Sequence, residues 1–280
     1  MSGAQPGERA LRVGFIGLGS QGAPMARRIA EDGFPLTLWA RRPQSVEPFR
    51  DTGATVAATP GSLGASSDVV GICVVSDDDV EDVLLRSDGV LSGMSAGGAV
   101  AIHSTIHPDT CRRVAARAAE HDVAVIDAPV SGGGLAAANR ALLVMVGGEP
   151  AAVEMCRPML ETYGNPVIHL GPLGSGQMAK LINNFVFTAQ ISMALDTFSF
   201  ADRLGIDPSA LGAVLAHGSG GSRAATILSA SGLDLTGLRS AASLLHKDVH
   251  LMLDVARQRG AAEPTMLLEA ALRTLAVLQQ

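Results

Sequence analysis

The chain has 280 residues, 47% of them apolar and only 3% aromatic, and its formal net charge is −6 at pH 7. This length favours two domains, and the negative charge argues against nucleic acid or an anionic membrane surface as a partner. No uncharged apolar run reaches the roughly 18 residues that a membrane-spanning helix needs. The three cysteines are isolated, and the first residues lack the pattern of a secretory signal, so we expect a reducing, cytoplasmic location.

The first predicted strand, residues 12–18, ends in a glycine-rich turn that leads into a helix. The turn reads G-L-G-S-Q-G, which matches the pattern G-x-G-x-x-G. In this pattern the first glycine permits the tight turn, the second admits a pyrophosphate, and the third lets the helix pack close to the sheet. Between a strand and a helix the pattern is typical of dinucleotide binding. The predicted cofactor contacts in this turn are Gly17, Leu18, Gly19, Gln21 and Gly22.

The second predicted strand, residues 35–40, indicates which dinucleotide is preferred. A fold that selects NAD carries Asp or Glu about 20 residues beyond the glycines, where the carboxylate accepts a hydrogen bond from the ribose 2′-hydroxyl. This chain has Ala40, Arg41 and Arg42 there, without an acid. Two guanidiniums suit a 2′-phosphate, so we predict that Arg41 and Arg42 bind NADP, with NAD as the less favoured cofactor.

Further apolar segments alternate with helical patterns, which predicts an α/β Rossmann domain with a mainly parallel sheet covered on both faces. The predicted strands are 54–59, 68–75, 99–105, 123–130, 141–148 and 166–171. The last two are close enough in sequence to form an antiparallel extension. Loops that follow the strand ends line the cofactor crevice in such folds, so we expect contacts from Val75, Ser76 and Thr105.

The segment D-A-P-V-S-G-G-G, residues 127–134, is a second candidate binding loop. A serine followed by glycines leaves backbone N–H groups unobstructed, and a run of amides can hold a carboxylate. The alternative is a flexible surface loop. The pattern favours substrate binding by Ser131, Gly132 and Gly133.

A glycine-rich linker after residue 171 leads into a long helix, predicted over residues 177–204. Gln177, Lys180 and Asn184 share one face of this helix among apolar neighbours. Lys180 and Lys247 are the only lysines among 21 basic residues. A desolvated amine can release and regain a proton near neutral pH, which a guanidinium cannot. Lys180 is therefore the candidate catalytic residue, the alternative being a lysine that merely extends to solvent at the helix start.

Every later segment has a helical pattern, which predicts helices over 208–216, 222–229, 238–256 and 264–278. We therefore predict a dinucleotide-binding domain over residues 1–171 and a helical substrate and dimerisation domain over residues 172–280. Two histidine pairs, His103 with His107 and His246 with His250, lack a third ligand, so no metal site is predicted. Apolar residues in the helical half predict a homodimer or homotetramer.

Four motifs together resemble the β-hydroxyacid dehydrogenases, the family of 3-hydroxyisobutyrate dehydrogenase, tartronate semialdehyde reductase and glyoxylate/succinic semialdehyde reductase. They are GLGSQGAPMA near the start, DAPVSGG at 127, GSGQMAKLINN at 174 and HKDVHLML at 246, with STIHP at 104. The resemblance covers nearly the whole chain. It implies a Rossmann domain joined by a long helix to a helical domain, and hydride transfer between NADP(H) and a small β-hydroxyacid or its semialdehyde.

The resemblance also implies roles for individual residues. Lys180 would donate and accept the proton at the substrate oxygen, and Asn184 would orient the substrate. The loop of Ser131, Gly132 and Gly133 would bind the substrate carboxylate. The cofactor would be contacted by Thr105 and Lys247, and the family's Asn-Arg-Thr of NADP-dependent members would correspond to Ala40-Arg41-Arg42.

Four positions depart from the family pattern and place the identity of the substrate, more than the reaction type, in question. They are Gln21, Leu135, Arg140 and Ser240, which we expect near the phosphate turn, the substrate pocket or its entrance. One alternative function is an imine reductase on the same fold, which usually carries Asp or Tyr in place of Lys180. The other is a nucleotide-binding scaffold without activity, which the intact lysine, asparagine and Ser-Gly-Gly loop argue against.

Overall fold

Short buried strands that alternate with helices build a six-stranded sheet in the first part of the chain. The computed structural model describes residues 10–279, and the chain divides into two compact units, Met1–Lys180 and Leu181–Gln280. All neighbouring strands of the sheet are parallel, in the order β3-β2-β1-β4-β5-β6. The strands are β1 (Val13–Ile16), β2 (Leu36–Trp39), β3 (Thr55–Val56), β4 (Val69–Ile72), β5 (Ala99–Ile102) and β6 (Ala124–Asp127).

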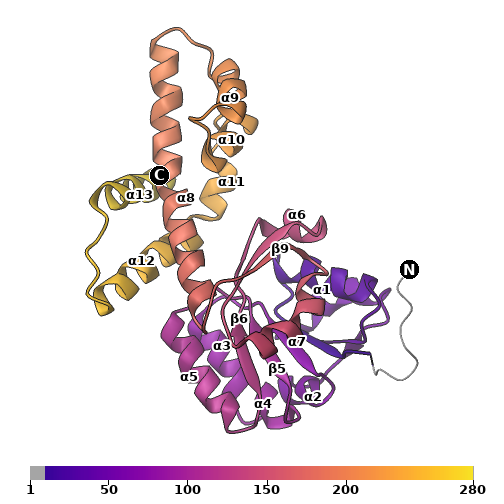
Figure 1. Ribbon diagram of the computed structural model, residues 1–280. Helices are drawn as coiled ribbons and strands as arrows, with labels where there is room; N and C mark the ends of the chain where they lie inside the picture. Colours follow the sequence, from indigo (N-terminus) through magenta and orange to yellow (C-terminus); the bar gives the residue numbers. More distant parts are fainter. Residues whose placement is uncertain (1–9, 280) are drawn as a thin grey trace. The chain divides into compact units, whose positions relative to one another are not determined.

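Helices cover both faces of the sheet (Figure 1). They are α1 (Gly22–Glu31), the 3-10 helix η1 (Pro43–Phe49), α2 (Pro60–Ala65), α3 (Asp77–Leu85), α4 (Val90–Gly93), α5 (Pro108–Ala119), α6 (Gly133–Ala138) and α7 (Pro150–Leu160). All of them except α6 and α7 lie in the connections between the strands of this sheet. The chain order of the strands reverses between β1 and β4, because β1 is followed by β2 and β3 on one side and by β4 on the other. A parallel sheet binds ligands outside the carboxyl ends of its strands at such a point.

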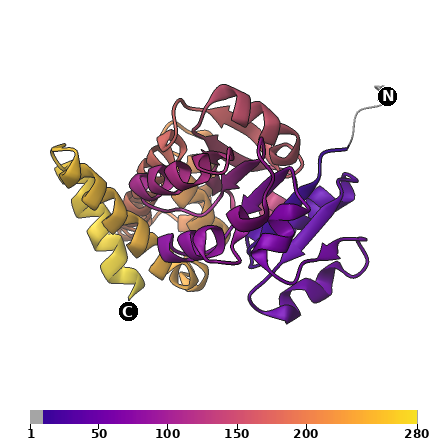
Figure 2. The ribbon, with the colours of Figure 1, turned by 90° about the horizontal axis from the view of Figure 1, so that it is seen from below.

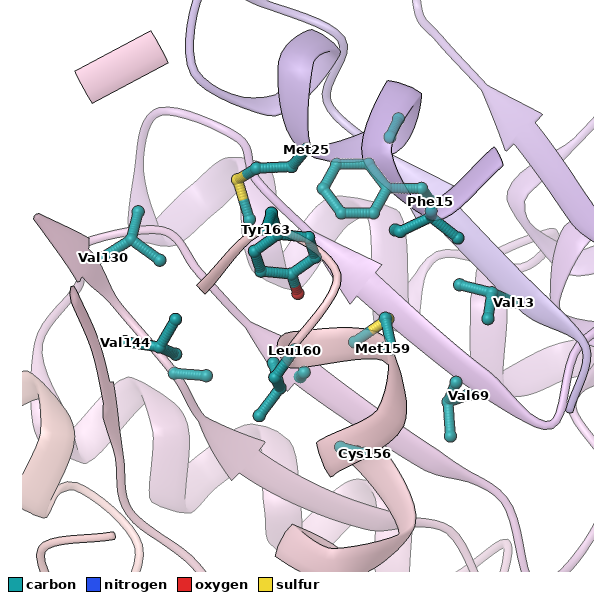
Figure 3. Packing of buried hydrophobic residues seen from close by; sticks show 14 of the residues in the cluster. Val13, Phe15, Met25, Val69, Val130, Val144, Cys156, Met159, Leu160 and Tyr163 are labelled. Atoms are coloured by element: carbon teal, nitrogen blue, oxygen red, sulfur yellow. The ribbon is translucent and has the colours of Figure 1, made fainter. Parts of the chain in front are cut away.

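Side chains of successive strand residues point to opposite faces, so the sheet separates two apolar clusters. Phe15 belongs to the cluster that packs under α1 and α7, together with Met25 and Tyr163, whose side chains lie side by side in Figure 3. Val70 and Ile72 belong to the cluster under α2, α3 and α5. Both clusters consist mostly of aliphatic residues, as the low aromatic content predicts.

Three further strands form a second, small sheet in the order β7-β8-β9. They are β7 (Val130–Ser131), β8 (Leu142–Val146) and β9 (Gly164–His169). The predicted antiparallel pairing of the last two strands is wrong, because β8 and β9 are parallel and α7 crosses between them. The antiparallel partner of β8 is β7, and an isolated antiparallel bridge joins Asp127 to Gly147.

The remainder of the described chain is helical, as expected. Its helices are α8 (Ser175–Arg203), α9 (Pro208–His217), α10 (Arg223–Ala230), α11 (Thr236–Ser240), α12 (Ala242–Gln258) and α13 (Thr265–Leu278). The sequence predicts one helix over 238–256, but the segment forms two, because Ala241 adopts φ −98° and ψ −1°, away from regular helical values. Among the helices of residues 10–279, none combines the length and apolar character needed to cross a membrane.

Within the C-terminal unit the later helices pack as two pairs, α9 with α10 and α12 with α13 (Figures 1 and 2). A third apolar cluster holds this unit together and includes Phe185, Phe198, Leu228 and Leu275. The predicted fold class, a Rossmann domain followed by a long helix and a helical domain, is confirmed. The two compact units divide after Lys180, within α8, whereas the sequence places the domain boundary after residue 171, where the helical region begins.

Candidate active site

The three glycines of the turn after β1 have three different structural roles. Gly17 has φ +96°, and an added Cβ would lie 2.1 Å from the carbonyl oxygen of Cys73, so the turn can pass against β4 only without a side chain. At Gly22 a Cβ would lie 1.9 Å from the carbonyl oxygen of Gly17, which explains how α1 begins so close to the strand. Gly19 is exposed, and a Cβ there would meet nothing within 4 Å. The absence of a side chain at Gly19 therefore keeps the space in front of the turn open.

The start of α1 fits the phosphates of a dinucleotide. Gln21 is the N-cap residue of α1 and makes no side-chain capping hydrogen bond, whereas the N–H of Ala23 donates to the Gly19 carbonyl at 2.9 Å and Pro24 has no N–H. The buried Nε2 atom of Gln21 has no acceptor within residues 10–279. A donor of this kind beside an open glycine turn suits an oxygen-rich ligand, and the residues present fit the cofactor.

A groove of about 370 Å³ opens at the carboxyl ends of β1, β2 and β4. The groove brings together six of the predicted cofactor contacts, which are Gly17, Leu18, Gly19, Arg41, Arg42 and Val75. Sequence reasoning missed several other lining residues, including Trp39, Ser45, Cys73, Val74 and Asp79. Burial raises the pKa of the Cys73 thiol to about 12, so this wall of the groove is uncharged at neutral pH.

The two arginines of the groove have different surroundings. Arg41 donates a hydrogen bond from Nη2 to Oδ1 of Asp79 at 2.6 Å. The Arg41 guanidinium lowers the pKa of Asp79, and the Asp79 carboxylate raises the pKa of Arg41. Arg42 is exposed and forms no ion pair with any residue of the described range 10–279. Ser76, predicted as a cofactor contact, caps α3 through its hydroxyl, which accepts from the N–H of Asp79 at 3.1 Å.

The loops after β4 and β5 support each other beside the groove. The Ser104 hydroxyl accepts a hydrogen bond from the N–H of Val74 at 2.9 Å, which fixes the chain just before Val75. Thr105 follows in a half-buried position at the end of β5. His103, which directly follows β5, is buried, and both of its ring nitrogens have partners in the core. Nδ1 is 2.8 Å from the Ala128 carbonyl, and Nε2 is 3.0 Å from the Tyr163 hydroxyl.

The His103 ring is therefore a structural group. Burial lowers its pKa to about 4, so the ring is neutral at physiological pH. The partner in the predicted pair, His107, caps α5 by accepting from the N–H of Asp109 at 3.0 Å. Within residues 10–279 no group of three His, Cys, Asp or Glu side chains is placed to hold a metal ion.

The Ser-Gly-Gly loop is an ordered turn between β7 and α6. Gly132 has φ +129° and Gly133 has φ +73°, both conformations that favour glycine, and Ser131 ends β7 in a half-buried position. An added Cβ at Gly134 would lie 2.4 Å from the carbonyl oxygen of Ser20. The candidate substrate loop therefore packs directly against the candidate phosphate turn.

Asp127, at the end of β6, fixes the first turn of α8. Its carboxylate accepts from the backbone N–H of Gly174 through Oδ1 and of Gln177 through Oδ2, each at 2.6 Å. Burial raises the pKa of Asp127 to about 6, although these hydrogen bonds act in the opposite direction. The Gln177 side chain is also structural, because Nε2 donates to the Ser104 carbonyl at 2.8 Å and Oε1 accepts from the N–H of Ile106 at 3.2 Å.

Lys180 lies one turn further along α8 and is only 9% exposed. It is the last residue of the N-terminal unit, and Asn184, four positions later on the same helix, belongs to the C-terminal unit. Within that unit the Asn184 side chain donates from Nδ2 to Oδ2 of the buried Asp248 at 2.6 Å. Lys247 is half-buried, with Nζ 3.5 Å from Oδ1 of Asp248. Asp248 thus holds Asn184 and lies beside Lys247.

Arg140, expected near the substrate pocket, serves a different purpose. It has φ +57° and makes two hydrogen bonds to the Asp32 carboxylate, at 2.7 and 2.6 Å, and one to the Thr162 carbonyl at 2.7 Å. Asp32 follows the C-terminal end of α1, the end away from the phosphate turn, so Arg140 ties α1 to the β8–β9 region. Leu135 is 78% exposed on α6, and Ser240 ends α11 with its hydroxyl on the Gly237 carbonyl.

Fold and groove define a dinucleotide-binding protein of the Rossmann type. Residues 12–171 match the family described as the NAD binding domain of 6-phosphogluconate dehydrogenase, and residues 174–280 match the family described as NAD-binding of NADP-dependent 3-hydroxyisobutyrate dehydrogenase. The chain belongs to the 3-hydroxyisobutyrate dehydrogenase family, as its motifs predict. It is an NAD(P)-dependent oxidoreductase of the hydroxyacid dehydrogenase type.

Individual relatives agree with this assignment. An L-threonate dehydrogenase from Cupriavidus necator is 33% identical over 251 residues, which covers 88% of this chain and 83% of that protein. The solved structure of a Mycobacterium tuberculosis 3-hydroxyisobutyrate dehydrogenase with L-serine matches with a TM-score of 0.85 and 27% identity, covering 97% of this chain and 95% of that one. An imine reductase from Pseudomonas sp. shares the fold at 20% identity and a TM-score of 0.62, covering 97% of this chain and 94% of that one.

Proposed function

We propose that this enzyme uses NADP(H) to oxidise a small β-hydroxyacid to the corresponding carbonyl acid, or to catalyse the reverse reduction. In a β-hydroxyacid the hydroxyl group is on the carbon β to the carboxylate. The observation that carries the proposal is the buried Lys180 on α8, one of two lysines in the chain, on the helix whose first turn is fixed by Asp127. L-Threonate and L-serine, named for two relatives, both carry a carboxylate and a hydroxyl at this spacing. The 3-hydroxyisobutyrate of the family name shares it.

Each part of the candidate site has a role in this reaction. Gly17, Leu18, Gly19, Gln21 and Gly22 receive the pyrophosphate, and the loops at Val75, Ser76 and Thr105 contact the rest of the nucleotide, with Lys247 from the helical unit. The backbone amides of Ser131, Gly132 and Gly133 hold the substrate carboxylate. The bound cofactor supplies or accepts the hydride.

Lys180 handles the proton. In the oxidation direction the substrate hydroxyl gives its proton to the neutral amine of Lys180. The hydride leaves the carbon that bears this hydroxyl, and a C=O bond forms. In reduction the ammonium of Lys180 returns the proton to the oxygen. Lys180 is only 9% exposed, so its side chain is largely removed from bulk water, which supports a role inside a substrate pocket. Asn184, held by Asp248, orients the reacting oxygen.

Arg41 and Arg42 support NADP over NAD. No carboxylate follows β2 to accept the ribose 2′-hydroxyl, and two guanidiniums stand at that end of the groove. A comparison of kcat/KM for NADPH and NADH tests this part of the proposal. An NADH preference would show that the two arginines are ordinary surface charges.

We further propose that the protein works in the cytoplasm as a homodimer or homotetramer. The support for an assembly is the set of large apolar side chains that remain more than 45% exposed on the C-terminal unit. They are Ile182, Met193, Phe200, Leu204, Ile206, Val214, Leu244, Met266 and Leu272. Sedimentation velocity over a range of concentrations would measure the assembly, and a monomer at all concentrations would contradict it.

A spectrophotometric screen of NADPH consumption tests the function. The substrates are glyoxylate, succinic semialdehyde and tartronate semialdehyde, with a cyclic imine as the comparison. L-Serine and L-threonate with NADP⁺ test the reverse direction. We expect turnover of tartronate semialdehyde, L-serine or L-threonate, which carry the reacting oxygen on the carbon β to the carboxylate, and none of the imine. Turnover of the imine alone would identify an imine reductase. Tight nucleotide binding with no turnover of any substrate would identify a scaffold.

A further inference from the structure

Asp79 stands out in the nucleotide groove because, among the described residues 10–279, it is the only carboxylate in the groove lining. It belongs to the first turn of α3, whose first three residues are all acidic: Asp77, Asp78 and Asp79. The three acids have different surroundings. Asp77 accepts from the N–H of His107 and the hydroxyl of Thr110, whereas Asp79 reaches Arg41, 38 positions earlier in the chain.

Asp79 is held in place on its own helix. Its Oδ2 accepts a hydrogen bond from the Ser76 hydroxyl at 2.9 Å, and its backbone N–H donates to the same hydroxyl. Its other oxygen, Oδ1, lies 2.6 Å from Nη2 of Arg41. The side chain of Asp79 is 24% exposed and that of Arg41 is 64% exposed. The carboxylate is therefore the fixed partner, and the arginine is the one free to move.

The pair alters the charge that the groove offers to an anion. Without Asp79, Arg41 and Arg42 would present two positive charges where the ribose 2′-substituent is expected. With Asp79 in contact, the charge of Arg41 is offset by the carboxylate, and one of its N–H donors is occupied. A 2′-phosphate that binds Arg41 has to displace or share the carboxylate and is repelled by it, whereas an uncharged 2′-hydroxyl is not.

We propose that Asp79 sets the cofactor selectivity of this enzyme by competing with the 2′-phosphate for the Arg41 guanidinium. The inference rests on the proposed preference for NADP and deepens it: Asp79 moderates that preference and leaves NAD usable. Because both side chains are partly solvated, the competition is modest, and its removal favours the phosphorylated nucleotide by roughly threefold to tenfold.

The test is calorimetric binding of two ligands that cannot transfer hydride, 2′-phospho-ADP-ribose and ADP-ribose, to the full-length protein. Asp79→Asn keeps the size of the side chain and removes its charge. Asp78→Asn is the matched control, because it removes the same charge from the same helical turn at an exposed position outside the groove lining. We expect Asp79→Asn to tighten 2′-phospho-ADP-ribose by about threefold to tenfold and to leave ADP-ribose and the control unchanged.

Besides an unchanged ratio of the two affinities in Asp79→Asn, two results would overturn the inference. If Asp79→Asn weakens 2′-phospho-ADP-ribose, the carboxylate orients Arg41 for the phosphate and does not compete with it. If Asp79→Asn and Asp78→Asn change the affinity for 2′-phospho-ADP-ribose equally, the effect comes from net charge, and Asp79 does not compete specifically for Arg41. In an Arg41→Gln background the Asp79→Asn gain should largely vanish, since its target is gone.

The same titrations separate this inference from the proposed function. A wild-type protein that binds ADP-ribose but not 2′-phospho-ADP-ribose would contradict the NADP proposal itself. A wild-type protein that binds both, with an unchanged ratio in Asp79→Asn, contradicts only the role of Asp79. Neither reading depends on knowing the substrate, because no turnover is measured.

Discussion

The nucleotide groove of the N-terminal unit and the Asn184 region of the C-terminal unit are built by different means. The phosphate turn depends on the backbone, because the positions of Gly17 and Gly22 require glycine: a Cβ at either would collide with a carbonyl oxygen. The region around Asn184 depends on side chains, because Asp248 holds the amide and lies beside Lys247. The second arrangement is a network of polar groups on helices, with no special backbone geometry.

This difference predicts how each region responds to substitution. A backbone-built site tolerates changes at neighbouring side chains but not the addition of a single carbon at its glycines. When a functional group is removed from a side-chain-built site, the protein stays folded and only binding or catalysis at that site is lost. The following experiments test that contrast, beginning with the largest effect.

Lys180→Met should lower kcat by about two to four orders of magnitude, because the hydroxyl proton loses its acceptor. Nucleotide affinity, measured by calorimetry, should change little, since the groove consists of other residues. Lys180→Arg is the companion variant: it keeps the positive charge but cannot deprotonate, so it should be nearly as inactive. Turnover near the wild-type value in either variant would remove Lys180 from the mechanism.

Gly22→Ala and Gly19→Ala compare two positions of one turn. Gly22→Ala should lower the free energy of unfolding by about 2–3 kcal/mol, because the new methyl group meets the Gly17 carbonyl and the turn must shift. Gly19→Ala should leave unfolding unchanged and weaken nucleotide binding, because its methyl group enters open space in front of the turn. Denaturant titration and calorimetry measure both quantities. Equal effects of the two variants on stability would contradict the separate roles of these glycines.

Asp127→Asn should destabilise the protein by about 1–3 kcal/mol near pH 4, because the amide nitrogen cannot accept from the Gly174 or Gln177 N–H group, whereas both oxygens of a protonated carboxyl can. The folded-state pKa of Asp127, about 6, lies above the ordinary value near 3.9, so the folded state binds the extra proton between these values. The contribution of Asp127 to stability is thus fully present below about pH 4 and is lost as the pH rises through about 6.

Unfolding of wild type and Asp127→Asn across pH 4 to 7 checks this sign, and the gap in stability should be largest at the acid end. A gap that widens toward neutral pH would mean that the hydrogen bonds from the start of α8 outweigh the cost of burying the charge. The experiment also bears on the contrast between backbone-built and side-chain-built regions, because the start of α8 in the N-terminal unit depends on the Asp127 side chain.

Much of the fold follows from local pattern. Gly17, Gly19 and Gly22 between an apolar strand and a helix identify the nucleotide site, and the loss of strand patterns after residue 171 identifies the helical region. The structure differs from the prediction where partners are distant in sequence. The β7 strand has two residues and no pattern of its own, and the parallel pairing of β8 with β9 depends on the crossover helix α7, which the spacing of the strands does not specify.

The same limit applies to the site. Arg41 and Arg42 are visible as a cationic pair, but the pairing of Arg41 with Asp79 requires knowledge that α3 begins beside the end of β2. Arg140 and Asp32 are 108 positions apart, so the sequence could not show that this arginine is structural. For Asp127 a signal exists, since an acid that ends a buried strand must find donors, but the sequence does not say that these donors are the first amides of α8.

The close approach of Gly134 to Ser20 restricts how this enzyme can acquire new specificities. Gly132 and Gly134 have no room for side chains, so the loop that we propose to hold the acid group is closed to gradual variation at these two positions. Longer or bulkier substrates have to be accommodated by residues beyond this loop, while the acid end stays as it is. If this loop binds the carboxylate as proposed, divergence of function on this scaffold should preserve that contact and change the residues around the rest of the substrate.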